Sequence, residues 1–492
     1  MTRSASIVVS LLFWFVTALS VNLRQGQEQH QPIVVDGDTD LLKLTHRIWN
    51  PLAKGTREDP IVIKGYKVVG PPVGTPCFSF ANTSKHIILQ APSCTLATTG
   101  ISLINVSSIE IVSLSFSQIV GIGGASSSLD GGPGIGAYIE DCGNVSLSGS
   151  GSMSFIYGGA GFVTGFGTKA GCGGSAYGIL ATNVSNISVT GLSFSSIYGG
   201  AGAAGLVSVG IGTPGGAGGE GGNASAISID GVETVSISKT SLSTIYGGAG
   251  GAGALGNAGP IGGNGGESAN GGNLHGIFIN NANDWVNVSS TTFGLLFGGA
   301  GSAGGAGDIY SGNGSSGADG GHVAGIYLVD SSASLSVTNC KMNLLYGGAG
   351  AAGSAGAAGL ALSGYSGGTG GFGGRGGFSV GVLVEATASG RVVVADNLLE
   401  DLKGGAGGAG ATGAIGDRGG QGGHGGIGGW AAGVCAIGGG EGTMVVKGST
   451  MTTLRGAAGA VGGLSALGYD GSLLPGGNGG DGGFGVGIAV VG

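Results

Sequence analysis

The stretch that decides the fold is Ala226–Gly253, AISIDGVETVSISKTSLSTIYGGAGGAG. It holds a first apolar pair, Ile227 and Ile229, and then an alternating pair, Val235 and Ile237. An aliphatic run, one aromatic residue and a long glycine tract follow. The chain repeats this order about eight times. Such internal repetition is typical of architectures built by stacking one short unit on the next.

Aligning the copies produces four columns that are apolar in every copy, and the residue inside the alternating pair is mostly polar. Alternation of this kind indicates half-buried strands. One copy is too short to bury a core, so we expect the copies to stack in register as a parallel solenoid with right-handed crossovers. One predicted column is Ile119, Ile156, Ile197, Ile245, Leu296, Leu345, Leu402 and Leu454.

Over residues 100–492 this pattern resembles the right-handed parallel β-helix family, the architecture of pectate lyases and many surface adhesins. The resemblance implies an all-β fold, a single-stranded right-handed parallel β-helix of about eight coils. No diagnostic motif of one enzyme family accompanies it.

The glycine tracts are the unusual feature of the chain, in which 120 of 492 residues are Gly. In Gly404–Gly428, Gly recurs at every third position, which is the period of the polyproline-II helix. Collagen is excluded because the chain has only 11 Pro. We expect each tract to run out and back as a hairpin and to stack on its neighbours in a polyglycine-II slab. The alternative is a set of flexible Gly/Ala loops.

Such a slab resembles the glycine-helix bundles of snow-flea antifreeze protein and phage tail-tip adhesins, and the glycine repeats of mycobacterial PGRS proteins. The outward positions of the first strand support it, because they are largely apolar and require a cover. We expect the glycine limbs to cover that face. Its apolar members are Tyr138, Leu180, Phe278, Tyr327 and Leu383.

Three segments are predicted. Residues 1–20 have the charged start, apolar run and small-residue end of a secretory signal, with a membrane anchor as the alternative. Residues 21–99 are assigned to an N-terminal cap of the solenoid, and residues 100–492 to the repeats with their glycine insertions. No second long apolar run occurs, so we expect no transmembrane segment in the mature chain and a secreted or cell-surface location.

Sequons and cysteines agree with export. We predict one disulfide between Cys77 and Cys94 and a second between Cys142 and Cys172, while Cys340 and Cys435 are expected to stay unpaired. The N-glycosylation candidates are Asn82, Asn105, Asn144, Asn183, Asn186, Asn223, Asn287 and Asn313.

Few residues suggest a catalytic, metal or nucleic-acid-binding site. The net charge is −8 and no Lys/Arg cluster occurs, which excludes a nucleic-acid partner. The weak catalytic candidates are Glu140, Asp230 and Glu385, which follow the first strand of their copies and read equally as a turn column. The triplet Gly423–Gly425 and the stretch Gly476–Phe484 only imitate a polygalacturonase motif and a calcium-binding repeat. We therefore assign no catalytic residue, cofactor or metal.

The leading hypothesis is a non-enzymatic structural or adhesive protein that presents a rigid β-helix and a glycine-rich slab to a glycan or to a cell-surface or matrix partner. One alternative is a carbohydrate-active β-helix enzyme of the lyase or hydrolase kind. Another is an ice-binding protein, which needs one flat face of small residues. The polar residues within the tracts speak against ice binding: Lys169, Glu220, Asp417, Arg418 and Gln421.

Overall fold

The structure is a computed structural model. It describes residues 30–44, 52–125, 129–210, 212–257, 263–308, 312–358, 366–385, 390–438, 443–469 and 472–491. The predicted signal peptide, residues 1–20, lies outside the described residues.

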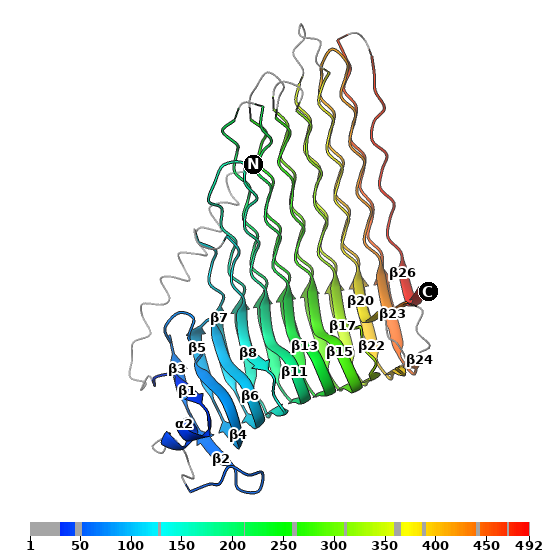
Figure 1. Ribbon diagram of the computed structural model, residues 1–492. Helices are drawn as coiled ribbons and strands as arrows, with labels where there is room; N and C mark the ends of the chain where they lie inside the picture. The colour runs from blue at the N-terminus through cyan, green and yellow to red at the C-terminus, as the bar shows by residue number, and fades with distance from the viewer. Residues whose placement is uncertain are drawn as a thin grey trace.

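The described chain is a parallel β-helix from which a wall of extended limbs projects (Figure 1). One sheet has sixteen strands and follows the order β1-β4-β6-β8-β11-β13-β15-β17-β20-β23-β26, with β2, β9, β18, β21 and β24 beside this path. The second sheet has ten strands in the order β25-β22-β19-β16-β14-β12-β10-β7-β5-β3. Neighbouring coils pair in parallel, as the repeat predicts.

The strands of the sixteen-stranded sheet are β1 (Ile33–Asp36), β2 (Ile61–Lys64), β4 (Phe78–Gln90), β6 (Thr99–Val112), β8 (Gly134–Glu140), β9 (Asn144–Ser148), β11 (Ala176–Thr190), β13 (Ala224–Ser238), β15 (Leu274–Ser289), β17 (Val323–Val329), β18 (Ser334–Thr338), β20 (Ser379–Glu385), β21 (Val392–Ala395), β23 (Ala431–Ile437), β24 (Met444–Lys447) and β26 (Gly485–Val491). Those of the ten-stranded sheet are β3 (Lys67–Val69), β5 (Ser93–Ala97), β7 (Ser115–Val120), β10 (Ser152–Tyr157), β12 (Ser193–Tyr198), β14 (Ser241–Tyr246), β16 (Thr292–Phe297), β19 (Lys341–Tyr346), β22 (Leu398–Lys403) and β25 (Thr450–Arg455). A single short helix, α2 (Asp38–Lys43), is present in the described chain.

The core contains the four predicted columns and the columns of the first apolar pair, such as Ile227 and Ile229, each stacked in register from coil to coil. Ile156 pairs with Ile197, and Ile197 pairs with Ile245, and these side chains are fully buried. The same column continues through Leu296, Leu345, Leu402 and Leu454. Burial of one such aliphatic side chain contributes about 1.5–3 kcal/mol, so a continuous column stabilises the stack and fixes its register at the same time.

Each coil turns at corners where the backbone enters the left-handed region, a feature that the sequence pattern did not reveal. One corner precedes the aliphatic column: Phe155, Ser196, Thr244 and Leu295 have φ of 54–56° there. Non-glycine residues rarely adopt such values. Their recurrence one coil apart shows that the stack of neighbouring strands imposes the bend.

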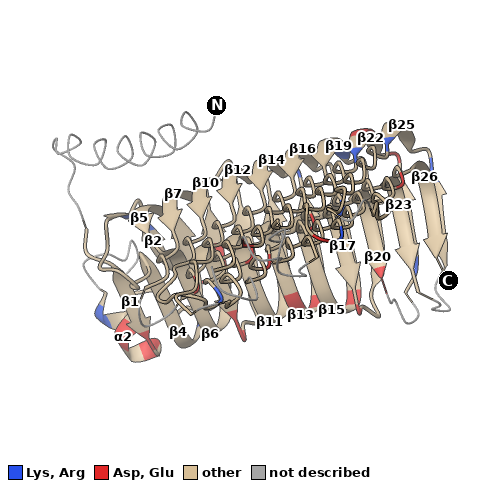
Figure 2. Ribbon diagram, turned by 90° about the horizontal axis from the view of Figure 1, so that it is seen from above, with Lys and Arg blue, Asp and Glu red and all other residues tan. Residues whose placement is uncertain are grey.

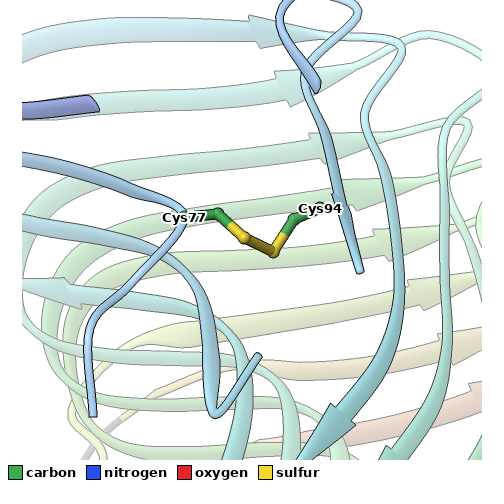
Figure 3. Close-up of a disulfide and its surroundings, with 2 residues drawn as sticks. All are labelled: Cys77 and Cys94. Carbon is green, nitrogen blue, oxygen red and sulfur yellow. A yellow bond between two sulfur atoms is a disulfide. The ribbon is translucent and has the colours of Figure 1, made fainter. Parts of the chain in front are cut away.

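The β-helix begins upstream of the predicted boundary at residue 100. Strands β2 and β3 already pair in parallel with β4 and β5, so residues 61–97 form coils of the same two sheets. Cys77 directly precedes β4, and Cys94 lies on β5. The disulfide between these two cysteines joins the two sheets across the first coils (Figure 3).

The glycine tracts form two hydrogen-bonded layers, the slab that their period predicts. Each tract leaves the ten-stranded sheet as an outgoing limb and enters the sixteen-stranded sheet as a return limb. Within the layer of outgoing limbs, Gly199 N donates to Tyr246 O of the next coil at 2.9 Å. Between the layers, Gly200 N donates to Gly174 O at 2.7 Å, and Gly222 N donates to Gly200 O at 2.8 Å. The outgoing limbs include 158–165, 199–207, 247–257, 298–308, 347–358, 404–416 and 456–468, and the return limbs include 169–175, 215–223, 263–273, 312–322, 367–378, 419–430 and 476–484.

The prediction that the limbs cover the outward face of the first strands is wrong. The limbs extend away from the ends of the strands (Figure 1), and in the view from above they are seen end on, in front of the sheets (Figure 2). In the last coils this face instead forms a small apolar cluster of its own, in which Val380 and Leu383 are buried. Two aromatic residues from the ends of return limbs, Phe378 and Trp430, pack against that cluster.

The slab predicts opposite effects for two adjacent residues. A Cβ added at Gly248 would lie 2.0 Å from Gly200 O, a distance that forces the layers apart, whereas Ala249 is exposed. We expect Gly248→Ala to lower the free energy of unfolding by about 3 kcal/mol and to raise amide exchange in limbs 199–207 and 247–257. Ala249→Gly is the control and should change either quantity little. Equal effects of the two substitutions, measured by thermal melting and hydrogen exchange, would contradict the layered packing.

Candidate functional site

The three-residue period sorts the limb side chains onto two opposite faces. Two of every three residues point into the slab, where glycine predominates, and the third faces solvent. The third residues of the outgoing limbs form one face, which we call the alanine face. Those of the return limbs form the other, which we call the polar face. The two faces carry different chemistry because different limbs supply them.

The alanine face is an uncharged lattice, and small side chains form its two rows nearest the strands, whereas Leu255 and Leu464 are large and exposed farther out. Its row nearest the strands is entirely alanine and exposed: Ala160, Ala201, Ala249, Ala300, Ala349, Ala406 and Ala458. The next row is Val163, Ala204, Ala252, Ala303, Ala352, Ala409 and Val461. At the foot of the lattice, Tyr157, Tyr198, Tyr246, Phe297 and Tyr346 stack on one another with ring centroids 4.9–5.2 Å apart.

The polar face is organised by side chains that accept hydrogen bonds from the next limb's backbone. Asn223 Oδ1 accepts from Asn273 N at 2.8 Å, and Asn273 Oδ1 accepts from His322 N at 2.8 Å. In the adjoining row, Asn270 Oδ1 accepts from Asp319 N at 3.0 Å. Backbone N–H groups that would otherwise face solvent are thereby satisfied, and the side chains are held in fixed positions.

Two adjoining hollows lie on this face. The inner hollow, nearer the strands, has a volume of about 260 Å³, and the outer hollow one of about 470 Å³. The two share Asn270 and Asp319. The inner hollow is lined by the side chains of Glu220, Asn223, Asn270, Asn273, Asp319 and His322. The outer hollow adds Glu267, Ser268 and Ser316.

Two carboxylates of the inner hollow stand in one row, two limbs apart. Gly221 N donates to Asn270 O at 3.0 Å, and Gly271 N donates to Asp319 O at 3.0 Å, which places Glu220, Asn270 and Asp319 on successive limbs in register. At about 4.8 Å per limb, the backbones of Glu220 and Asp319 are about 9–10 Å apart. The carboxyl groups of an inverting glycosidase are typically about 6.5–9.5 Å apart, so this backbone spacing lies at the upper limit of that range.

One histidine, His322, lines the inner hollow, and a second, His275, lies near it; burial lowers the pKa of both. His275 lies between Phe278 and Tyr327, with ring centroids 5.2 Å away in each case. Burial there, reinforced by the nearby His322, lowers the pKa of His275 to about 4. Burial also lowers the pKa of His322, although Asp319 acts in the opposite direction.

None of the acids predicted from the sequence lines either hollow. Glu140 and Asp230 stand in one column two coils apart, with Thr182 between them, and Glu385 lies three coils farther along that column. Glu140 and Asp230 therefore have the same spacing as Glu220 and Asp319, and it is the hollow that distinguishes the two pairs. Each of the three predicted acids is engaged locally: Glu140 accepts from Tyr138 Oη at 2.8 Å, and Glu385 accepts from Tyr327 Oη. Asp230 Oδ1 accepts from Asn280 Nδ2 and from Asn281 Nδ2, both at 2.9 Å.

The predicted second disulfide is wrong, because Cys142 and Cys172 are both free thiols. Cys142 is buried in the core of the β-helix, whereas Cys172 lies on a return limb, where Asp130 Oδ1 accepts from its backbone N–H at 2.7 Å. Cys340 and Cys435 are also free and buried.

Five of the eight sequon asparagines occupy structural positions of two kinds, and the other three, Asn144, Asn186 and Asn287, lie on strands. Asn82, Asn105 and Asn183 stand at left-handed corners with φ of 52–54°, a conformation that asparagine tolerates. Asn223 and Asn313 lie on the polar face and accept backbone hydrogen bonds from the next limb. The glycosylation of these sites stays a prediction.

Sequence reasoning missed Glu267, Asp319 and His322, and it treated Glu220 only as an unwelcome charge. A signal was present, since these residues occupy the third position of successive triplets near the end of a tract. The sequence does not show where a tract turns back. The polar third residues of the return limb therefore cannot be told apart from the alanines of the outgoing limb.

Comparison with known proteins gives few matches. No protein-family model matches the chain, and no curated protein does. The solved structures that match include the crystal structure of the periplasmic alginate epimerase AlgG, with 9% identity, 85% of this chain and 83% of that chain covered, and a TM-score of 0.18. A mutant of that epimerase matches with 9% identity over 85% of this chain and 82% of its own, at a TM-score of 0.19. The fold assignment rests on the sheet topology and not on this likeness.

The leading hypothesis of a non-enzymatic structural or adhesive protein is corrected. The four matching structures are all of an epimerase, an enzyme named for its action on alginate. At TM-scores of 0.18–0.20 this likeness carries no argument about the activity of the chain. The correction rests on the polar face, which holds hollows lined by carboxylates and a histidine that a purely structural slab does not require.

None of the described helices is long and apolar enough to cross a membrane. Within the same part of the chain, His, Cys, Asp and Glu side chains do not gather in threes as metal ligands.

The lowered pKa of His275 predicts an acid-sensitive fold. The unfolded chain binds this proton at its ordinary pKa of about 6.5, whereas the folded chain binds it only near 4. Stability from His275 is therefore complete above pH 6.5 and is lost as the pH falls toward 4, by about 3 kcal/mol in all. His275→Phe keeps an aromatic ring and removes the titration. Urea unfolding at pH 7 and pH 4.5 should show a smaller drop for the variant; an equal drop would contradict the assignment.

Proposed function

We propose that the protein is an exported carbohydrate-active protein that binds a polysaccharide on the polar face and acts on it in the inner hollow. The observation that carries this proposal is the pair Glu220 and Asp319, which face the same hollow two limbs apart. Amide and hydroxyl side chains surround the pair and suit the many hydroxyl groups of a sugar.

The spacing of the pair supports hydrolysis with inversion. One carboxyl group, in its acid form, gives its proton to the glycosidic oxygen as the bond from that oxygen to the anomeric carbon breaks. The other, as a carboxylate, removes a proton from a water molecule that attacks the same carbon from the opposite side. The products are a hemiacetal and a free hydroxyl, and the two carboxyl groups together return to their starting protonation after one proton exchange with solvent.

Conservative substitutions test the pair. Glu220→Gln and Asp319→Asn keep side-chain shape, and Asn at position 319 can still accept the hydrogen bond from Arg375 N, as Asn270 does from Asp319 N. We expect each to lower the rate of polysaccharide cleavage at least 100-fold. The measurement is release of reducing ends from a panel of neutral and charged polysaccharides.

The column predicted from the sequence provides the matched controls. Glu140→Gln and Asp230→Asn alter carboxylates of the same kind outside the hollows and should leave the rate unchanged. Loss of activity in Asp230→Asn with retention in Asp319→Asn would move the active site to the strand ends and overturn the proposal.

Ice binding is a second candidate function, favoured by the alanine face. The charged and polar residues that spoke against it lie elsewhere: Glu220 and Gln421 are on the polar face, and Asp417 lies at the tip of a limb. What remains is an uncharged lattice that consists of small side chains in the two rows nearest the strands. Its methyl groups repeat about every 4.8 Å across the limbs and about every 9.3 Å along each limb.

A single lysine in the middle of the lattice tests this candidate. We expect Ala303→Lys to abolish thermal hysteresis, because a long charged side chain interrupts the rows of small side chains. Thr369→Lys, an exposed position on the polar face, should leave it intact. Absence of thermal hysteresis from the unaltered protein at millimolar concentration would rule out ice binding.

A further inference from the structure

His322 is the one ring side chain that lines the inner hollow. It is the last residue of return limb 312–322 and is half-buried. The preceding limb holds its backbone, since His322 N donates to Asn273 Oδ1 at 2.8 Å. The following limb holds its ring, which stacks on Phe378 with centroids 3.9 Å apart and planes 11° apart. The position and the plane of the imidazole are therefore both fixed.

The tautomer of the ring is also fixed. Phe378 N, a backbone donor, gives its hydrogen bond to His322 Nδ1 at 3.1 Å. A nitrogen that accepts such a bond carries no proton, so the proton of the neutral ring is on Nε2. Nε2–H is then the hydrogen-bond donor that this side chain offers.

The surroundings keep this ring neutral near pH 7. Burial lowers the pKa of His322, with Asp319 as the charged group that opposes the shift. His275, the other titratable neighbour, is itself uncharged there because its pKa is about 4. A neutral ring with one fixed N–H donates to a ligand without adding charge to the carboxylates beside it.

We infer that His322 is a ligand-binding residue whose Nε2–H donates a hydrogen bond to an oxygen of the sugar held between Glu220 and Asp319. This inference rests on the proposed polysaccharide site. Ionised carboxylates can only accept hydrogen bonds, so they bind sugar hydroxyls. His322 instead suits a sugar oxygen that has no proton of its own, either an ether oxygen or the carbonyl oxygen of an acylated amino sugar.

The chain contains a matched control for this residue. His424 accepts a hydrogen bond from the next limb in the same way, from Asn478 N to Nδ1 at 2.8 Å, and it stacks on Phe372. It does not line either hollow. Aspartate can replace both histidines as the acceptor, because Asp319 Oδ1 already accepts from Arg375 N in this slab. His322→Asp and His424→Asp thus keep the backbone bond, and both remove the ring with its N–H donor and its stacking and add one carboxylate charge, so the two variants differ only in whether the position lines the hollow.

The experiment measures the tautomer of His322 and the binding of an oligosaccharide to the same protein. Protein labelled with ¹⁵N-histidine should show His322 as the Nε2–H tautomer at pH 7, and its Nε2 signal should move when a hexamer of N-acetylglucosamine or of glucose is added. His322→Asp should weaken oligosaccharide binding at least tenfold, and His424→Asp by less than twofold. Thermal melting of both variants checks that the slab stays folded.

The failures are distinguishable. An Nδ1–H tautomer, or an Nε2 signal that stays still while the hexamer binds, overturns the role of His322 and leaves the polysaccharide site standing. Binding of neither hexamer nor of any charged oligosaccharide to the unaltered protein overturns the proposed function, and the role of His322 with it.

Discussion

The repeat distance between parallel strands, about 4.8 Å, is the constraint on which the whole molecule depends. The aliphatic columns fix it in the β-helix, where Ile156, Ile197 and Ile245 lie directly above one another. The limbs inherit it because each is continuous with a strand. Glycine loses more conformational freedom on ordering than any other residue, and a limb alone could not offset that cost. Limbs that start in register can offset this entropy cost, because their backbones lie at hydrogen-bonding distance along their whole length.

The same constraint gives the slab two unlike surfaces. Limbs in register place every third residue of one layer in a common row. The residue type that recurs at this position in the sequence therefore determines the chemistry of the whole face. Alanine in the outgoing limbs produces an uncharged face. Asparagine, aspartate and histidine in the return limbs produce a face on which each side chain accepts from the next limb's backbone. The groups of the candidate site are held by the fold's own hydrogen bonds, which leaves a ligand little rearrangement to cause.

Much of the fold could be predicted from the sequence, because the core columns and the glycine period are local and repetitive signals. The column from Ile119 to Leu454 and the paired limbs both follow from such periods. The left-handed corners could not be predicted, since residues as different as Phe155 and Thr244 adopt one backbone conformation there under the pressure of their neighbours. The candidate site was missed for a different reason. Glu220, Asp319 and His322 meet only once the direction of each limb is known.

The three-residue repeat of the limbs also restricts how such a protein can change length. Adding one residue to a limb rotates everything beyond it by a third of a turn. Side chains that faced water would then enter the space between the layers, where a Cβ at Gly200 would already lie 2.0 Å from Gly159 O. Limbs can therefore lengthen or shorten in whole triplets, or at their tips. Away from the tips, the length of the limbs can therefore change in evolution only in steps of three residues, and it can change far more easily than the number of layers in the slab.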